Sequence, residues 1–125
     1  MTAIKKLDHI VITTPQAERC IAFYEKLGFA SRDAGGRYEL FAGDFKINVH
    51  IIGAELLPKA ANVCAGSADV CFEIDGDIEK FKAQLEEQNI ITEQGIVARH
   101  GVRGDMRSVY LRDPDGNLLE FSSYE

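Results

Sequence analysis

The pattern of apolar and polar residues predicts one strand, one helix and three further strands in the first half of the chain. Residues 7–12 are rich in β-branched side chains and run into Thr14-Pro15, which favours a strand that ends at this break. Thr14 is a suitable helix N-cap, and the apolar residues of 17–27 recur at helical spacing as far as Gly28, so we predict a helix between these points. Strands are predicted at 29–32, 37–41 and 45–52, separated by glycine-containing turns.

The second half of the chain repeats this order of elements. A strand is predicted at 69–74, followed by a helix that Asp77 caps and Asn89 ends, and by strands at 90–98, 107–112 and 117–123. The tetrapeptide 113–116, Asp-Pro-Asp-Gly, is typical of a hairpin turn. We therefore predict a single α+β domain, 1–125, built from two βαβββ modules at about 4–53 and 67–125, with a linker at 54–66.

Composition excludes several classes of protein. A chain of 125 residues with 46% apolar residues can bury the core of a single domain. Its 20 acidic and 14 basic residues give a net charge of −6, which disfavours nucleic acid and anionic membrane surfaces as partners. No signal-peptide or membrane-spanning stretch is evident, and three cysteines without a CxxC motif are typical of buried thiols. We expect a cytoplasmic protein.

Strand alternation places four candidate metal ligands on the sheet faces away from the helices. His9 lies opposite to Ile10 and Ile12 on its strand, and Asn48 and His50 lie opposite to Ile47 and Val49 on theirs. The same reasoning turns Asp69 and Glu120 away from the apolar positions of the second module. We predict that His9 matches Asp69, and His50 matches Glu120, in the two modules.

Two imidazoles and a carboxylate suit a divalent ion such as Zn²⁺, Ni²⁺, Fe²⁺ or Mn²⁺. In this hypothesis Asp69 is a fourth ligand, an outer-shell partner or a base. His100, which lies in a loop-like stretch, is interpreted as a surface histidine.

Candidate substrate contacts come from the stretch 99–105 and the strand that follows it. This stretch is basic and glycine-rich, so we predict that it closes over an anionic substrate, with Arg103 and Arg107 as binding residues. Ser108 and Tyr110 fall on the site face of their strand, where Tyr110 can donate a proton or hydrogen bond. Asn48 is a further predicted substrate contact.

These residues resemble the vicinal oxygen chelate superfamily, the glyoxalase/bleomycin resistance/dioxygenase group. The resemblance covers essentially the whole chain and rests on three stretches, 7–12 (Leu-Asp-His-Ile-Val-Ile), 23–29 (Phe-Tyr-Glu-Lys-Leu-Gly-Phe) and 110–121, which contains Asp-Pro-Asp-Gly-Asn. Residues 46–50 and 66–72 are similar to a small bacterial branch of glyoxalase-like virulence proteins.

The resemblance implies a cup-shaped mixed sheet around a divalent metal, helices on its outer face, and commonly a homodimer. It implies ligands at His9, His50, Asp69 and Glu120. Asp69 stands where related enzymes usually have histidine or glutamine, so His9, His50 and Glu120 are the preferred three-ligand set.

The leading functional hypothesis is a lactoylglutathione-lyase-like enzyme in which Glu120 moves the proton. Its substrate is a small molecule, anionic or linked to glutathione. The alternatives are an extradiol-type dioxygenase, an enzyme that transfers a thiol to an epoxide antibiotic, and a non-catalytic resistance module that binds a drug or metabolite.

Overall fold

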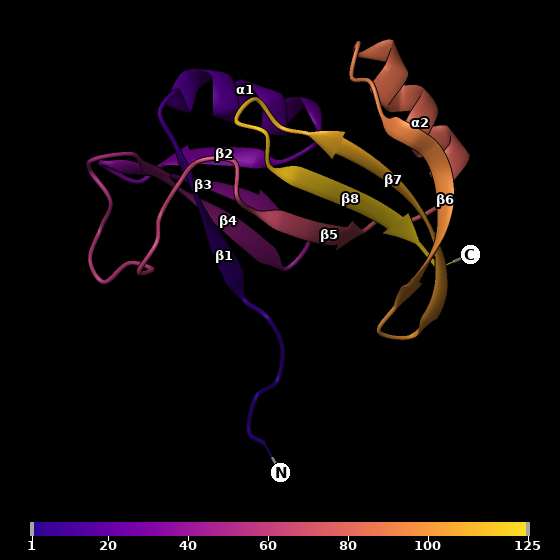
Figure 1. Ribbon diagram of the computed structural model, residues 1–125, viewed down its shortest axis with the longest axis horizontal. Helices are drawn as coiled ribbons and strands as arrows, with labels where there is room; N and C mark the ends of the chain where they lie inside the picture. Colours follow the sequence, from indigo (N-terminus) through magenta and orange to yellow (C-terminus); the bar gives the residue numbers. More distant parts are fainter. Residues whose placement is uncertain (1, 125) are drawn as a thin grey trace. The chain divides into compact units, whose positions relative to one another are not determined.

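The computed structural model describes residues 2–124, which divide into two compact units, Met1–Ala65 (unit 1) and Gly66–Glu125 (unit 2). Each unit contains one helix and four strands (Figure 1). The elements of unit 1 are β1 (His9–Thr14), α1 (Ala17–Lys26), β2 (Ala30–Asp33), β3 (Arg37–Ala42) and β4 (Phe45–Ile51). Those of unit 2 are β5 (Asp69–Glu73), α2 (Ile78–Glu87), β6 (Glu93–Gly101), β7 (Gly104–Arg112) and β8 (Leu118–Ser123).

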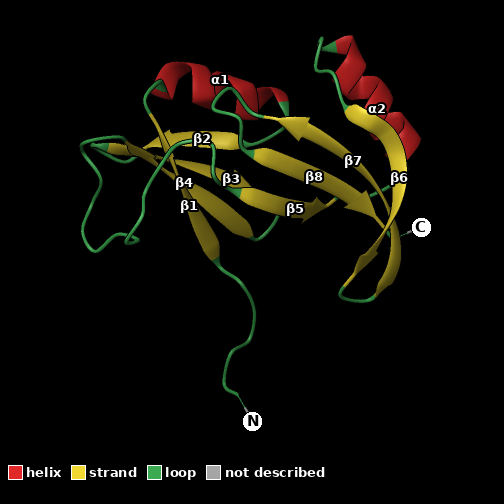
Figure 2. Ribbon diagram, in the orientation of Figure 1, coloured by secondary structure: helices red, strands yellow, loops and turns green. Residues whose placement is uncertain are grey.

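Both units have the same sheet topology. The strand order is β1-β4-β3-β2 in unit 1 and β5-β8-β7-β6 in unit 2. The first strand of each unit runs parallel to the last one, β1 with β4 and β5 with β8, and the remaining pairs are antiparallel. The prediction of an α+β fold made of two βαβββ modules is therefore confirmed (Figure 2). That the two units act as a single domain stays a prediction.

The two helices end in the same way but begin differently. At the end of α1, Gly28 has φ +106°, and Phe29 N–H donates to the carbonyl of Tyr24 at 3.1 Å; at the end of α2, Asn89 has φ +61°, and Ile90 N–H donates to Leu85 at 2.9 Å. A residue with left-handed backbone lets the next N–H group donate to a carbonyl that the helix end would leave without a partner. The predicted ends of the two helices, at Gly28 and Asn89, are therefore confirmed.

Helix starts show one correction. The Asp77 carboxylate accepts the Glu79 N–H at 2.7 Å and the Lys80 N–H at 3.4 Å, as predicted for an N-cap. Thr14 is not the N-cap of α1, because its hydroxyl accepts the Gln16 N–H in a local turn and the helix begins only at Ala17.

A hydrophobic core lies between the helix and the sheet of each unit. In unit 1 the fully buried Tyr24 of α1 makes an edge-on contact with Phe29, whose ring meets Phe45 in the same way. In unit 2 the ring of Phe121 contacts Phe72 and Phe81 at centroid distances of 5.2 and 5.0 Å. These contacts fix which face of each sheet is apolar, and hence which face is left for polar chemistry.

The turn between β7 and β8 connects to the start of β5 through buried polar side chains. Asp113 accepts the backbone N–H of Asn117 at 3.0 Å and its side-chain amide at 2.7 Å. The amide oxygen of the Asn117 side chain, Oδ1, accepts the Ala68 N–H at 2.9 Å, and Leu118 N–H donates to the Ala68 carbonyl at 3.0 Å. Gly66 lies so close to this turn that an added Cβ would lie 2.4 Å from the Asp115 carbonyl oxygen. The predicted hairpin turn thus also sets the register of β5 on β8.

No helix among residues 2–124 combines the length and the apolar composition needed to cross a membrane.

Candidate functional site

The polar face of the unit 1 sheet carries three rows of side chains across β1, β4 and β3. Residues that are partners across neighbouring strands point to the same face of a sheet. The rows are His9, Lys46 and Phe41; then Val11, Asn48 and Glu39; then Thr13, His50 and Arg37. His9 and His50 therefore share a face, as predicted, but they are four positions apart along adjacent strands, which is about 13 Å.

The corresponding rows of unit 2 cross β5, β8 and β7. They are Asp69, Leu118 and Arg112; then Cys71, Glu120 and Tyr110; then Glu73, Ser122 and Ser108. Asp69 thus occupies the place of His9, as predicted. Glu120, however, occupies the place of Asn48, and Ser122 that of His50, so the predicted match of His50 with Glu120 is wrong by one row. Alternation identified the face correctly but does not fix which residues pair across strands.

His9 is exposed at the start of β1 and is oriented by its neighbour. Its Nδ1 lies 2.7 Å from Oδ1 of Asp8. A carboxylate only accepts hydrogen bonds, so Nδ1 donates, and in the neutral ring the lone pair is left on Nε2. The hydrogen bond to His9 lowers the pKa of Asp8. A histidine held by a carboxylate in this way is the usual arrangement of a metal-binding imidazole.

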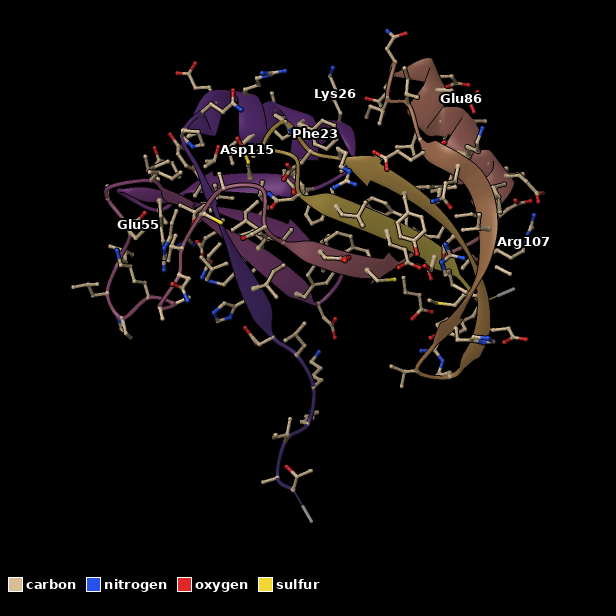
Figure 3. All side chains as sticks on the ribbon, viewed as in Figure 1. Phe23, Lys26, Glu55, Glu86, Arg107 and Asp115 are labelled. Carbon is tan, nitrogen blue, oxygen red and sulfur yellow. The ribbon has the colours of Figure 1, made fainter. Side chains whose placement is uncertain are left out.

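Asn48 and His50 are buried on the polar face, at 4% and 7% exposure. Among residues 2–124, Asn48 Oδ1 and His50 Nε2 are buried atoms without a hydrogen-bond partner. Burial and the charge of Arg37 lower the pKa of His50, against an opposite effect of Glu55. Figure 3 labels Glu55 in the segment that follows β4. Two orphaned polar atoms on adjacent rows need a ligand or water to complete their hydrogen bonds.

Glu120 is positioned by a chain of hydroxyl groups. Ser122 Oγ donates to Glu120 Oε2 at 3.1 Å and lies 2.6 Å from the Ser108 hydroxyl. The Cys71 Sγ lies 3.2 Å from the same Ser122 hydroxyl, and burial is the largest cause that raises the pKa of this thiol. Ser108 is fully buried, so it supports Ser122 and, contrary to the prediction, does not reach outward to a substrate.

Tyr110 is the strand partner of Glu120 and is held by Arg99. The Arg99 Nε donates to the tyrosine hydroxyl at 2.8 Å, and the guanidinium lies 5.3 Å from the ring centroid. Since the hydroxyl oxygen accepts from Arg99, its own proton remains available to a substrate oxygen. The sequence singled out Tyr110 and placed Arg99 in the basic stretch, but it gave no role to Asp8 or Ser122, although strand alternation already places Ser122 on the same face as Glu120.

The predicted loop 99–105 is a hairpin, and its Arg103 is paired with a carboxylate. β6 continues to Gly101 and β7 begins at Gly104, because the chain turns within two residues. Arg103 donates to both carboxylate oxygens of Glu73, at 3.2 and 2.8 Å, and lies 4.2 Å from the Tyr124 ring centroid. His100 is a surface residue, as predicted, at 2.7 Å from Asp105. The stretch is thus part of two paired strands, and its closure over a substrate stays a prediction.

Arg107 lies on the other face of its strand. It alternates with Ser108 on β7, and its guanidinium lies 2.5 Å from the Glu79 carboxylate of α2. Figure 3 labels Arg107. The structure thus keeps Arg107 on the helix-covered face and does not bring it to Glu120.

The candidate ligands are not gathered into a metal site in the described part of the chain. Among residues 2–124, no three His, Cys, Asp or Glu side chains form a group that could hold a metal ion. Each unit holds one pair of candidate donors at equivalent positions of its own sheet. The pairs are His9 with Asn48 in unit 1 and Asp69 with Glu120 in unit 2, and the two members of a pair lie on adjacent strands and on the same face of their sheet.

The three cysteines are free thiols, as predicted, but only Cys20 is buried, whereas Cys64 and Cys71 are exposed. The expectation of three buried thiols is therefore wrong for two of them.

Comparison with known proteins identifies the family. The model of the Glyoxalase/Bleomycin resistance protein/Dioxygenase superfamily matches residues 6–121. The chain is 42% identical over 124 residues to glyoxalase domain-containing protein RDO1 of Mycosarcoma maydis, a match that covers 98% of this chain and 70% of that protein. It is 39% identical over 123 residues to virulence protein STM3117 of Salmonella typhimurium, covering 97% of this chain and 85% of that protein.

Solved structures of similar sequence have the same fold. The crystal structure of virulence protein STM3117 has a TM-score of 0.95 at 38% identity and covers 99% of this chain and 100% of that one. An integron cassette protein from V. cholerae has a TM-score of 0.94 at 42% identity, covering 100% of this chain and 99% of that one. The chain belongs to the Glyoxalase/Bleomycin resistance protein/Dioxygenase superfamily.

Proposed function

We propose that this protein is a metal-dependent enzyme of the glyoxalase type, similar to lactoylglutathione lyase. Its substrate is a small molecule with two adjacent oxygens, linked to glutathione or another thiol. The proposal is supported by membership of the superfamily. One observation carries it: His9 and Asn48 in unit 1 have the same sheet positions as Asp69 and Glu120 in unit 2.

The proposed metal donors are two pairs, His9 with Asn48 Oδ1 in unit 1 and Asp69 with Glu120 in unit 2. They fit a divalent ion such as Zn²⁺, Ni²⁺, Fe²⁺ or Mn²⁺, because imidazole, carboxylate and amide oxygen are its usual donors. Two features of this chain support the fit: Asp8 leaves Nε2 of His9 available, and Asn48 Oδ1 is buried without a partner. The four-position separation from His9 removes His50 from this set.

A divalent ion held by these residues would supply Lewis acidity toward the two substrate oxygens. Glu120 is the proposed base: it removes the proton from one carbon of the hemithioacetal and returns it to the neighbouring carbon, so the substrate is isomerised without an added reactant. The Ser122 hydroxyl donates to Oε2 of Glu120, so Oε1 is the oxygen that would serve both as metal donor and as base. Tyr110, fixed by Arg99, donates its hydroxyl proton in a hydrogen bond to a substrate oxygen.

The test measures metal content and turnover together. Protein loaded with Ni²⁺ or Zn²⁺ is expected to convert methylglyoxal with glutathione to lactoylglutathione. Glu120→Gln is expected to lower kcat by at least about 100-fold, as for loss of a general base, while Glu87→Gln on the exposed side of α2 leaves it unchanged.

Other outcomes would contradict the proposal. Oxygen uptake with a catechol under Fe²⁺, without lyase turnover, would favour a dioxygenase. A protein that binds no divalent ion, with a melting temperature unchanged by added metal, would favour a binding module.

We also propose that the protein is a homodimer. The support is the exposed apolar surface of unit 1 along and before β1, where Leu7 is 69% and Val11 48% exposed. Large apolar side chains exposed at an interface are covered by the partner, which is how a dimer would bury these two. Light scattering that gives the mass of one chain at micromolar concentration would contradict it.

A further inference from the structure

One row on the unit 1 sheet has a surplus of hydrogen-bond donors. Thr13, His50 and Arg37 are strand partners across β1, β4 and β3, so their side chains stand side by side on one face. We call them the donor row. A hydroxyl, an imidazole and a guanidinium can each donate hydrogen bonds, and here they stand in line on one face of the sheet.

The positive charge of this row is not neutralised within the unit. Among the ion pairs of residues 2–124 there is none with Arg37, although this side chain is half-buried. Nε2 of His50 is buried and has no hydrogen-bond partner in that range. A half-buried cation beside an unsatisfied buried imidazole is costly unless a ligand pairs with both.

The carboxylates near the donor row are engaged elsewhere. Glu39, on the adjacent row, lies 2.5 Å from Lys46 Nζ and 3.0 Å from Arg32 Nε. Glu55 accepts the Gly53 N–H at 3.0 Å and pairs with Lys59 at 3.6 Å. Neither carboxylate forms an ion pair with Arg37, although the charge of Arg37 contributes to the lowered pKa of Glu39 and Glu55 acts on the pKa of His50. An anion from outside the chain could therefore pair directly with Arg37.

We propose that Thr13, His50 and Arg37 bind an oxyanion, the carboxylate or phosphonate group of a small ligand. The planar guanidinium takes two oxygens of the anion, and the neutral imidazole and the hydroxyl each donate one further hydrogen bond. The equivalent row of unit 2 is Glu73, Ser122 and Ser108, which carries a carboxylate instead of a cation. Anion binding therefore distinguishes unit 1 from its repeat. As a statement about the substrate, this inference rests on the proposed function, whereas anion binding itself does not.

Anion binding is measured by NMR on the full chain after treatment with a chelator, so that no metal takes part. Inorganic phosphate, methylphosphonate and acetate are titrated separately at pH 8 and low salt. We expect saturable shifts at the three residues of the donor row with at least one of these probes, and the comparison of probes tells a phosphonate site from a carboxylate site.

Variants separate the donor row from general charge effects. Arg37→Gln is expected to weaken binding by about tenfold, the usual size for loss of a charge-assisted contact. Arg37→Lys keeps the charge and is expected to bind with intermediate strength. Thr13→Val, which has the same shape, is expected to weaken binding by severalfold. Arg19→Gln removes an exposed charge of the same unit and is expected to bind as the unaltered protein does.

Three results would overturn the inference: no saturable shift with any probe, shifts centred on Arg99 or Arg103, or equal affinities of Arg37→Gln and Arg19→Gln. A melting temperature within a few degrees of the unaltered protein checks that each variant is folded. The two proposals are tested separately. Absence of metal binding would contradict the proposed function and leave anion binding intact, and absence of anion binding would contradict this inference and leave the proposed function intact.

Discussion

Replacing Asn117 by Ala tests whether the β7–β8 turn holds unit 2 together. Asn117 is 1% exposed, and its side chain makes two hydrogen bonds in opposite directions, accepting the Ala68 N–H and donating to Asp113. Alanine at this position removes both hydrogen bonds. The Ala68 N–H and the Asp113 Oδ2 then each have one partner fewer. The backbone hydrogen bond from Asn117 N–H to Asp113 is retained.

The expected loss follows from the kinds of hydrogen bond involved. The neutral one with Ala68 is worth about 1 kcal/mol and the charged one with Asp113 about 2 kcal/mol, so Asn117→Ala should lower the free energy of unfolding by roughly 3 kcal/mol. For a chain of this size that corresponds to a fall in Tm of roughly 10 °C. Urea unfolding followed by circular dichroism measures the first quantity and calorimetry the second.

Two further variants make this reasoning refutable. Asn117→Asp keeps the shape but sets a second carboxylate against Asp113, so it should destabilise at least as much as the alanine. Asn62→Ala, at an exposed position, should stay within about 0.5 kcal/mol of the unaltered protein. If Asn117→Ala also stays within that limit, the turn does not anchor β5, and the register that places Asp69 and Glu120 on adjacent strands has another cause.

Three further predictions concern backbone and charge. Gly66→Ala should destabilise by at least about 2 kcal/mol, because φ is +80° and the Cβ would collide with Asp115. Asp77→Ala should cost about 1 kcal/mol through loss of the α2 cap, measured by urea unfolding. Lys46→Met should shift acid unfolding to higher pH. The hydrogen bond from Lys46 lowers the pKa of Glu39, so Glu39 stabilises the fold above its usual pKa of 4.5, and this stabilisation is lost as pH falls through the lowered pKa.

Each of these has a matched control. Gly35→Ala also places a side chain at positive φ, +74°, but nothing lies within 4 Å, so it should cost less than Gly66→Ala. Gln16→Ala should change stability little, since Gln16 makes no side-chain cap at α1. Lys82→Met breaks an exposed pair on α2 and should leave acid unfolding nearly unchanged. Equal effects within any of these pairs would contradict the corresponding argument.

The sequence predicted the fold because its signals are local. Gly28 and Asn89 end helices through left-handed backbone, and Asp77 caps one through its own carboxylate, each within a few residues. Alternation likewise assigned His9 and Glu120 to the polar sheet faces. Thr14 misled because its hydroxyl has a competing local partner, the Gln16 N–H.

The candidate site was predicted less completely because pairing between strands is not local. Alternation has a period of two and cannot tell Asn48 from His50, whereas the β1–β4 register sets Asn48 as the counterpart of Glu120. The ion pair of Arg103 was also not predicted, since its partner Glu73 lies 30 positions away in the sequence.

By itself, then, the sequence determined the two βαβββ modules, the polar faces of their sheets and the family. Only the tertiary structure decided which polar residues stand side by side, which cations already have partners, and that Asn48 and His50 are buried with unsatisfied atoms. The physical reason is that periodicity and capping act over a few residues, while register, ion pairing and burial depend on strands that the chain brings together from distant positions.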